Sequence, residues 1–252
     1  MKPGWKIYAI LAAGLVALKI NAPVVTAEET ERSPSPSNAQ QTIEIVPGVT
    51  LWSGYENSDW ASYFIPKGVK KVAREPVIDG GVLFLGDSIT ESAPFEYMFP
   101  GITVANHGVP GDTSAGALHR LALVTQNTPE RVFIKIGTND LNYGYDAEAI
   151  ASNVFEIADR LHQEMQGVEL YVISLTPREK QAMNAINKAN QLLQAGAVSS
   201  KYTFLNIAPY LKAADGAIDP QFSSDSLHLN TQGYKVWAEK MDACVRQGCK
   251  GL

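Results

Sequence analysis

Two residues that could cooperate in acyl transfer, Ser88 and His228, lie far apart in the sequence. Ser88 comes just after the apolar run VLFLG (82–86), and His228 follows Asp225 by three residues in DSLHLN. A serine hydroxyl needs a base within hydrogen-bond reach before it can attack an ester carbonyl. An acid and an imidazole at this spacing can meet across one turn, and the acid would orient the imidazole to accept the serine proton. The same spacing also arises by chance on protein surfaces, so alone it is a weak signal.

Acyl transfer also needs hydrogen-bond donors for the negative oxygen of its tetrahedral intermediate. Three candidates are the backbone N–H of Ser88, the N–H of Gly111 in NHGVPGDTS and the side-chain amide of Asn139 in GTND. Glycine allows close backbone approach and a positive φ, and an asparagine amide donates without competing for the proton. Singly, Gly111 could mark a plain turn and Asn139 a turn or a helix cap. Because each donor follows its own apolar run, we favour an oxyanion hole.

The other three histidines are weaker candidates for the base. His107 follows the second apolar run and could touch the site, although structural hydrogen bonds in a loop are the simpler interpretation. His119 and His162 lie in segments with helical character, so we expect both at the surface.

Metal chemistry has little support in the sequence. Asp87, Asp112 and Asp140 could be imagined as a metal cluster, but we expect them to hydrogen-bond the loops that carry the candidate site residues. Neither HExxH nor a Cys/His ligand spacing is present, and no cofactor is expected. The G-x-S-x-G elbow of α/β-hydrolases is also missing, so that family is not the template.

Five apolar runs provide the strands that must position these residues. They are VLFLG (82–86), ITVAN (102–106), RVFIKIG (131–137), ELYVISL (169–175) and TFLNI (203–207). Helical segments are expected at 147–166, 181–199 and 231–246. Strands that are apolar throughout and alternate with helices predict a parallel sheet covered on both faces. We therefore predict an α/β fold, a three-layer α/β/α sandwich with about five parallel strands, whose ligands bind beyond the carboxyl ends of the strands.

The motifs GDSIT, NHGVPGD, GTND and DSLH together resemble those of the SGNH/GDSL hydrolase superfamily, in the same chain order. The stretches LFLGDSIT, GVPGDTSAGALHRL and LTPR are most similar to its platelet-activating-factor acetylhydrolase-like esterases. The resemblance implies a flavodoxin-like sheet, Ser88 as nucleophile, His228 as base and acid, and Asp225 as its orienting partner. It also implies an oxyanion hole of Ser88, Gly111 and Asn139. One departure is Ile89, where the family name has leucine.

The N-terminus has the features of a secretory signal peptide, which we assign to residues 1–27. Lys2 and Lys6 precede the apolar stretch 7–18, and small residues precede Glu28 as a signal peptidase requires. We therefore expect a secreted or periplasmic protein without a stable membrane span after cleavage. An uncleaved N-terminal anchor is the alternative, although 12 apolar residues are few for a span.

The remaining chain divides by composition. Residues 28–41, EETERSPSPSNAQQ, predict a flexible linker, and 42–80 an extension that packs on the main domain, 81–246. A short tail, 247–252, completes the chain. We assign no regular secondary structure to the extension. Its aromatic residues either pack on the domain or line a substrate cleft: Trp52, Tyr55 and Trp60.

Charge and cysteine content limit the partners. The net charge is −5, and no cluster of Lys and Arg stands out, which argues against a nucleic-acid partner. The two cysteines, Cys244 and Cys249 in CVRQGC, could form a local disulfide in an oxidising compartment or remain free thiols, and we favour the disulfide. The oligomeric state is not predicted.

These features predict an exported serine esterase that acts on small-molecule, glycan or lipid esters. Short acyl groups such as O-acetyl groups of polysaccharides are our first expectation. A lysophospholipase or other lipid esterase, and an O-acyltransferase with the same triad, are alternatives. A non-catalytic sugar-binding module that uses Trp52 and Trp60 is a further alternative, against which the intact Ser88, Asp225 and His228 count.

Overall fold

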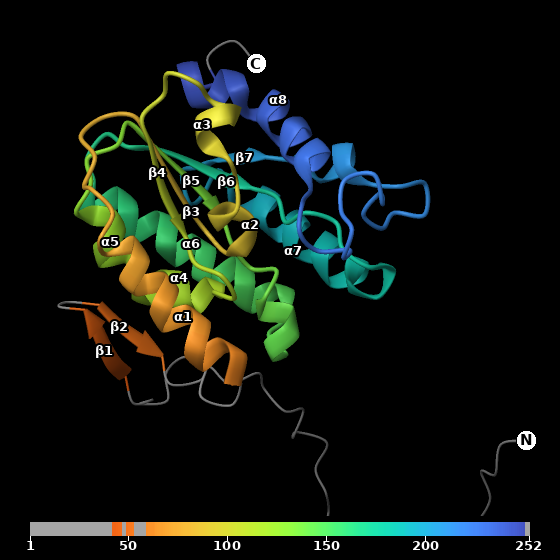
Figure 1. The fold of residues 1–252 in the computed structure, drawn as a ribbon, viewed down its shortest axis with the longest axis horizontal. Helices are drawn as coiled ribbons and strands as arrows, with labels where there is room; N and C mark the ends of the chain where they lie inside the picture. Colours follow the sequence, from red (N-terminus) through yellow and green to blue (C-terminus); the bar gives the residue numbers. More distant parts are fainter. Residues whose placement is uncertain (1–41, 47–48, 53–58, 250–252) are drawn as a thin grey trace, which may run out of the picture. The chain divides into compact units, whose positions relative to one another are not determined.

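The central element is a five-stranded parallel sheet, which confirms the predicted α/β fold (Figure 1). The computed structural model describes residues 42–46, 49–52 and 59–249, with side chains from residue 65 onward. The sheet order is β4-β3-β5-β6-β7, the flavodoxin-like order in which the first strand of the domain has its neighbours on both sides. Its strands are β3 (Val82–Gly86), β4 (Val104–Gly108), β5 (Arg131–Lys135), β6 (Glu169–Ile173) and β7 (Thr203–Leu205).

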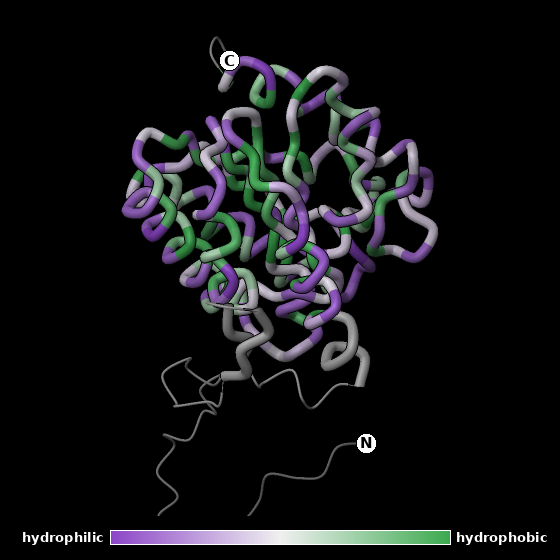
Figure 2. Tube along the Cα trace, turned by 60° about the vertical axis from the view of Figure 1, so that its left-hand side comes forward, coloured by the Kyte–Doolittle hydropathy of each residue, from purple (hydrophilic) through white to green (hydrophobic). Residues whose placement is uncertain are grey.

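Two layers of helices cover the sheet. One face contacts α4 (Ser114–His119), α5 (Leu121–Thr125), α6 (Ala147–Glu164) and α7 (Met183–Gly196). The other face contacts α2 (Ser88–Glu91), α3 (Phe95–Met98) and α8 (Thr231–Gln247). Side chains alternate between faces, so β3 supplies Leu83 and Leu85 to the first core and Val82 and Phe84 to the second. Figure 2 shows the same concentration of hydrophobic residues along the central strands.

Periodicity located the long helices to within a few residues. The predicted segment 147–166 is α6, which Asp146 caps by accepting a hydrogen bond from the backbone N–H of Ala149 at 2.8 Å. The segment 181–199 becomes α7 after a short 3-10 turn, Lys180–Ala182. The last predicted helix is α8.

One strand prediction was displaced, with consequences for a histidine. The second strand was expected at 102–106 and instead spans β4, because Val82 pairs with Val104 and Gly86 with Gly108. His107 therefore lies inside a strand that is hydrogen-bonded to β3, and not in a loop after it.

The N-terminal extension contains regular structure that sequence patterns did not predict. Strands β1 (Thr42–Val46) and β2 (Val49–Trp52) form an antiparallel hairpin, and α1 (Asp59–Val72) follows. The hairpin lies against α1, α4 and α5. The signal peptide 1–27 and linker 28–41 lie outside the described residues, as does Tyr55, and the side chains of Trp52 and Trp60 are likewise not described.

The predicted disulfide between Cys244 and Cys249 is present and confirmed. Helix α8 ends at Gln247 and is capped by Gly248, whose φ of 73° lets the chain turn back toward Cys244. Of the predicted tail, residues 250–252 lie outside the described part.

Candidate active site

The position of Ser88 depends on the two residues before it. The side chain of Asp87 accepts a hydrogen bond from the backbone N–H of Ile89 at 2.9 Å and so caps α2. At Gly86, any Cβ would lie 2.0 Å from the Thr90 hydroxyl oxygen and 2.5 Å from the Lys135 carbonyl oxygen. Only glycine permits this close approach of α2 to the end of the sheet. The G-D-S sequence thus places the serine directly at the carboxyl end of β3.

The structure brings Ser88, His228 and Asp225 into one hydrogen-bonded chain. The Ser88 hydroxyl lies 2.9 Å from Nε2 of His228, and Nδ1 of His228 lies 2.7 Å from Oδ2 of Asp225. The other oxygen of Asp225 accepts the backbone N–H groups of His228 at 2.8 Å and Leu227 at 3.0 Å. Ser226, which directly follows Asp225, has a φ of 62°, a left-handed conformation that a non-glycine residue rarely adopts. The turn is therefore held tightly around the carboxylate.

Hydrogen bonds control the charge of Asp225. Its partial burial alone would raise the carboxyl pKa, but hydrogen bonds from the His228 ring and from two backbone N–H groups outweigh that effect. The pKa of Asp225 is consequently held well below its usual range. An ionised Asp225 favours the tautomer of His228 that keeps hydrogen on Nδ1 and leaves Nε2 free to accept the serine proton.

Gly111 and Asn139, the other predicted oxyanion donors, lie in two loops that are bonded to each other. Gly111 has a φ of 79°, the left-handed conformation that glycine accommodates without strain. The Asn139 amide donates one hydrogen to the Asp112 carbonyl oxygen at 2.9 Å. An amide carries two hydrogens, so the second has no partner among the described residues.

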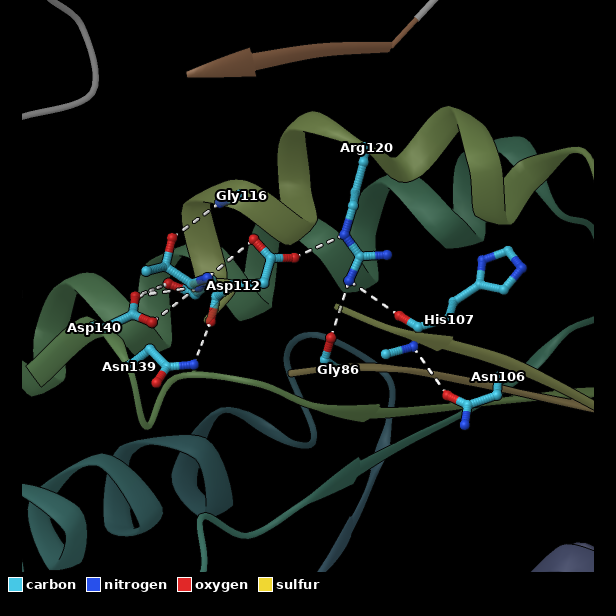
Figure 3. A network of polar contacts seen from close by, with 11 residues as sticks. Gly86, Asn106, His107, Asp112, Gly116, Arg120, Asn139 and Asp140 are labelled. Atoms are coloured by element: carbon cyan, nitrogen blue, oxygen red, sulfur yellow. Dashed lines mark hydrogen bonds and ion pairs between the residues drawn. The ribbon is translucent and has the colours of Figure 1, made fainter. Parts of the chain in front are cut away.

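A buried ion pair fixes the loop that follows β4. Nε of Arg120 lies 2.7 Å from Oδ2 of Asp112, and both side chains are fully buried. The same guanidinium donates to the carbonyl oxygens of Gly86 and His107, each at 3.0 Å (Figure 3). Arg120 therefore joins the ends of the two strands that lead to Ser88 and Gly111. Sequence patterns did not indicate this role for Arg120, whose only local signal is an arginine within the stretch GALHRL.

A second buried contact ties the same loop to the Asn139 loop. Asp140 accepts the backbone N–H of Ser114 at 2.9 Å and the Ser114 hydroxyl. Asn153 donates to that hydroxyl at 2.9 Å. Burial raises the pKa of Asp140 to about 6, against the opposing effect of the Ser114 hydrogen bonds. The expectation that these aspartates support loops is confirmed. The described residues contain no group of three or more His, Cys, Asp and Glu side chains that could hold a metal.

The remaining histidines differ from expectation in burial. His107 is buried at 3% exposure, where burial and the nearby Arg120 charge lower its pKa to about 3. His119 was expected at the surface but is half-buried, which lowers its pKa. His162 is half-buried and contacts the carbonyl oxygen of Lys201 at 2.9 Å. We find no contact of these three histidines with Ser88 among the described residues.

Two grooves border α2. The first has a volume of about 830 Å³ and lies between α1 and residues Glu91 and Pro110. Four basic side chains line it, which overturns the reading that no Lys/Arg cluster stands out: Lys67, Lys70, Lys71 and Arg74. The second has a volume of about 630 Å³ and lies between α3 and α8. It begins at Ser92 and at Leu229, the residue after His228, and includes Tyr97 and Met98.

Comparison with known sequences identifies the family. The sequence profile of the GDSL-like lipase/acylhydrolase family matches residues 84–236. The chain belongs to this family. The match includes all five residues predicted for the site: Ser88, Gly111, Asn139, Asp225 and His228. The resemblance to SGNH/GDSL hydrolases is thereby confirmed. Helix α1 and the hairpin lie outside the matched region.

The individual relatives of this GDSL-family chain share about a third or less of its residues over the matched region. The N-acylneuraminate cytidylyltransferase of Streptococcus agalactiae serotype V is 32% identical over 152 residues, which are 60% of this chain and 35% of that protein. The chain thus spans about a third of that relative. Platelet-activating factor acetylhydrolase IB subunit alpha2 of Gallus gallus is 27% identical over 178 residues, 66% of this chain and 76% of the relative.

The GDSL-family fold recurs in solved structures. A Streptococcus pneumonia protein, assigned provisionally as a platelet activating factor, superposes with a TM-score of 0.69 at 23% identity, covering 75% of this chain and 95% of that chain. At this identity the likeness shows the shared fold alone. The family places the described domain among the lipases and acylhydrolases, which are carboxylic ester hydrolases.

Proposed function

We propose that this protein hydrolyses carboxylic esters with short acyl groups through an acyl-enzyme on Ser88. The hydrogen-bonded chain from Ser88 through His228 to Asp225 carries the proposal. It has the connectivity in which an acid orients an imidazole and the imidazole activates a hydroxyl. Family membership supports the same reaction class.

The proposed reaction has two halves. Ser88 Oγ attacks the ester carbonyl carbon while its proton moves to Nε2 of His228, and the carbonyl electron pair moves onto oxygen. The N–H groups of Ser88 and Gly111 and the Asn139 amide bind that oxyanion. When the C–O bond to the alcohol breaks, the alcohol leaves with the proton from His228. Water then gives a proton to Nε2 of His228 while its oxygen attacks the acyl carbon. The C–O bond to Ser88 breaks, Ser88 Oγ takes the proton back from His228, and the acid is released. No metal or organic cofactor takes part.

The test is the turnover of p-nitrophenyl acetate by Ser88→Ala and by a control, Ser152→Ala. Ser152 is an exposed serine on α6. Loss of the nucleophile should reduce kcat by about 10⁴-fold or more, while the control keeps wild-type turnover. Near-normal turnover by a folded Ser88→Ala protein would refute the mechanism.

A short acyl group is our first choice for the substrate. It is supported by the similarity to a relative named as an acetylhydrolase. The apolar groove between α3 and α8 favours a second candidate, lipid esters, because Tyr97, Met98 and Leu229 could cover a longer chain. A series of p-nitrophenyl esters from acetyl to palmitoyl separates them. A maximum at acetyl or butyryl supports the first, and a maximum at long chains that Met98→Ser abolishes supports the second.

Export remains part of the proposal. The predicted signal peptide supports it, as does the Cys244–Cys249 disulfide, since disulfides persist in oxidising compartments. No helix in the described part of the chain is long and apolar enough to cross a membrane. Mass spectrometry of the protein from its native host should find a mature N-terminus at Glu28. A retained Met1 in the membrane fraction would indicate an uncleaved anchor.

A further inference from the structure

Helix α1 packs directly on the loop that carries Gly111. A Cβ built on Gly68 would lie 2.8 Å from Cγ1 of Val109 and 3.3 Å from Cδ of Pro110, so helix and loop are in close contact. Ile65, Val69 and Val72 on the same helix share one buried apolar cluster with Val109 and Leu123. Contact this close fixes the position of α1 relative to Gly111.

Helix α1 is also attached to the segment that carries Ser88. Lys71 forms an ion pair with Glu91 at 2.8 Å, and Glu91 is the last residue of α2. The Asn106 amide donates to the Glu91 carbonyl oxygen at 3.1 Å and holds α2 against β4. The Lys71–Glu91 ion pair is partly exposed, so it contributes little to stability. It nevertheless shows that α1 lies beside the end of α2. Helix α1 contacts both segments that supply the proposed backbone donors of the oxyanion hole.

The groove between these elements has an excess of positive charge. Four basic residues and two acids, Glu75 and Glu91, line it, in a chain whose net charge is −5. Lys71 is neutralised by Glu91, whereas Lys70 and Arg74 form no ion pair with any described residue. Cations in the last turn suit the helix dipole. That effect does not explain Lys67, which lies five residues before the last residue of α1. Nor does it explain why several like charges are close together, because like charges repel at helical spacing.

We propose that this groove binds a negatively charged group on the alcohol part of the ester substrate, and that the substrate is an acylated acidic saccharide. The inference rests on the proposed function. A short acyl group such as acetyl carries no charge, so a negative charge on the substrate must lie on its alcohol part. The groove has cations but no large exposed hydrophobic side chain; in the described residues these are Val77, Tyr97, Val198 and Tyr210. A lipid whose headgroup lay in this groove would need exposed apolar side chains in the same groove for its acyl chains, and such side chains lie instead in the separate groove between α3 and α8, so an acidic saccharide fits better.

The test compares two matched substrates. One is an acetylated oligogalacturonide, and the other is the same acetylated oligosaccharide with its carboxyl groups converted to primary amides after acetylation, so that the acetyl groups are the same and the negative charge is removed. We expect wild-type kcat/KM to be higher for the charged substrate. Raising NaCl from about 0.05 M to 0.5 M should remove most of that preference, because salt screens exposed charges.

The decisive variant is Lys70→Gln/Arg74→Gln. Its ratio of kcat/KM for the charged over the neutral substrate should fall about 3- to 30-fold, the range expected for two exposed charge contacts. The control Arg160→Gln/Lys188→Gln removes one arginine and one lysine from surface ion pairs on α6 and α7 and should keep the wild-type ratio. If the groove variant kept the wild-type ratio and still hydrolysed p-nitrophenyl acetate, the inference about the groove would be overturned, and the proposed esterase function would stand.

Binding supplies a readout that is independent of turnover. The Ser88→Ala protein should bind the charged substrate by calorimetry more tightly than the neutral one, and the added groove substitutions should abolish the difference. Equal binding of both substrates would also overturn the inference. Preferential binding instead to vesicles containing an anionic phospholipid, lost in the groove variant, would replace the saccharide by a lipid. Loss of the proposed function itself would appear separately, as p-nitrophenyl acetate turnover that does not require Ser88.

Discussion

The two halves of the candidate active site differ in burial. On one side, the side chains of His228 and Asp225 are 44% and 51% exposed and lie on one turn shortly before α8. On the other, Arg120 and Asp112 are fully buried and Asp140 nearly so. The exposed half contacts the Ser88 hydroxyl, whereas the buried half contacts backbone and loops.

This contrast indicates a division of physical roles. Exposed charges contribute little to folding stability because water screens them, so substitutions in the first half should act mainly on turnover. A buried charge that loses its partner is costly, so substitutions in the second half should act first on stability. Three predictions test the contrast.

The largest effect is expected from Asp225→Asn. An amide would stabilise the wrong tautomer of His228, and kcat on p-nitrophenyl acetate should fall about 10²- to 10⁴-fold. The free energy of unfolding in urea should change by less than about 1 kcal/mol, because the carboxylate is half exposed. The control Asp215→Asn changes another acid in an exposed loop and should leave kcat intact. Strong destabilisation with unchanged kcat would reverse the assignment of roles.

A smaller but still large effect is expected from Arg120→Met. The substitution leaves a buried carboxylate without its cation and removes the donors to Gly86 and His107, so unfolding should cost about 3–5 kcal/mol less. Arg120→Lys should recover only part, because an ammonium cannot reproduce the planar fork of contacts. In the control Arg160→Met, which changes a half-exposed arginine, the free energy of unfolding should fall by less than about 1 kcal/mol. A mild Arg120→Met variant, measured by urea unfolding, would remove the contrast between the halves.

The smallest effect concerns pH and His107→Gln. The pKa of His107 is about 3 in the folded protein, against 6.5 for an unperturbed histidine. The stability contributed by neutral His107 is therefore fully present above pH 6.5 and is lost as pH falls toward 3. We compare the change in the free energy of unfolding between pH 7 and pH 5 in the two proteins. This change should be more favourable in His107→Gln than in the wild type by about 2 kcal/mol. Asp140 acts oppositely: its pKa of about 6 means that acidification from pH 6 to 4 is stabilising.

The two buried groups therefore offset each other in the wild type. Urea unfolding of the His107→Gln protein at pH 4, 5, 6 and 7 should show stability that rises on acidification, which the wild type masks. If the free energy of unfolding of the two proteins depended on pH in the same way, His107 would not be held neutral by its surroundings. Water would then reach the buried half of the site more than its contacts indicate.

Local signals were enough to predict much of the fold. Continuous apolar runs identified the strands, and β3 was predicted to the residue because Gly86 and Asp87 end the run sharply. The second strand was misplaced by two residues because ITVAN and VANHG are both acceptable strands. Their choice depends on pairing with β3, a long-range interaction. The turn Asp225–His228 was predictable because its contacts lie within three residues.

Periodicity and short spacing are enough to predict the parallel α/β class, the chain order of the site motifs and the local Asp225–His228 contact. Three features could be seen only in the folded protein: Arg120 joins the ends of β3 and β4, His107 is buried, and Lys70 and Arg74 border the Gly111 loop. Those features depend on segments that meet only after the sheet has formed, and the burial that changes a charge or a pKa exists only in the packed molecule.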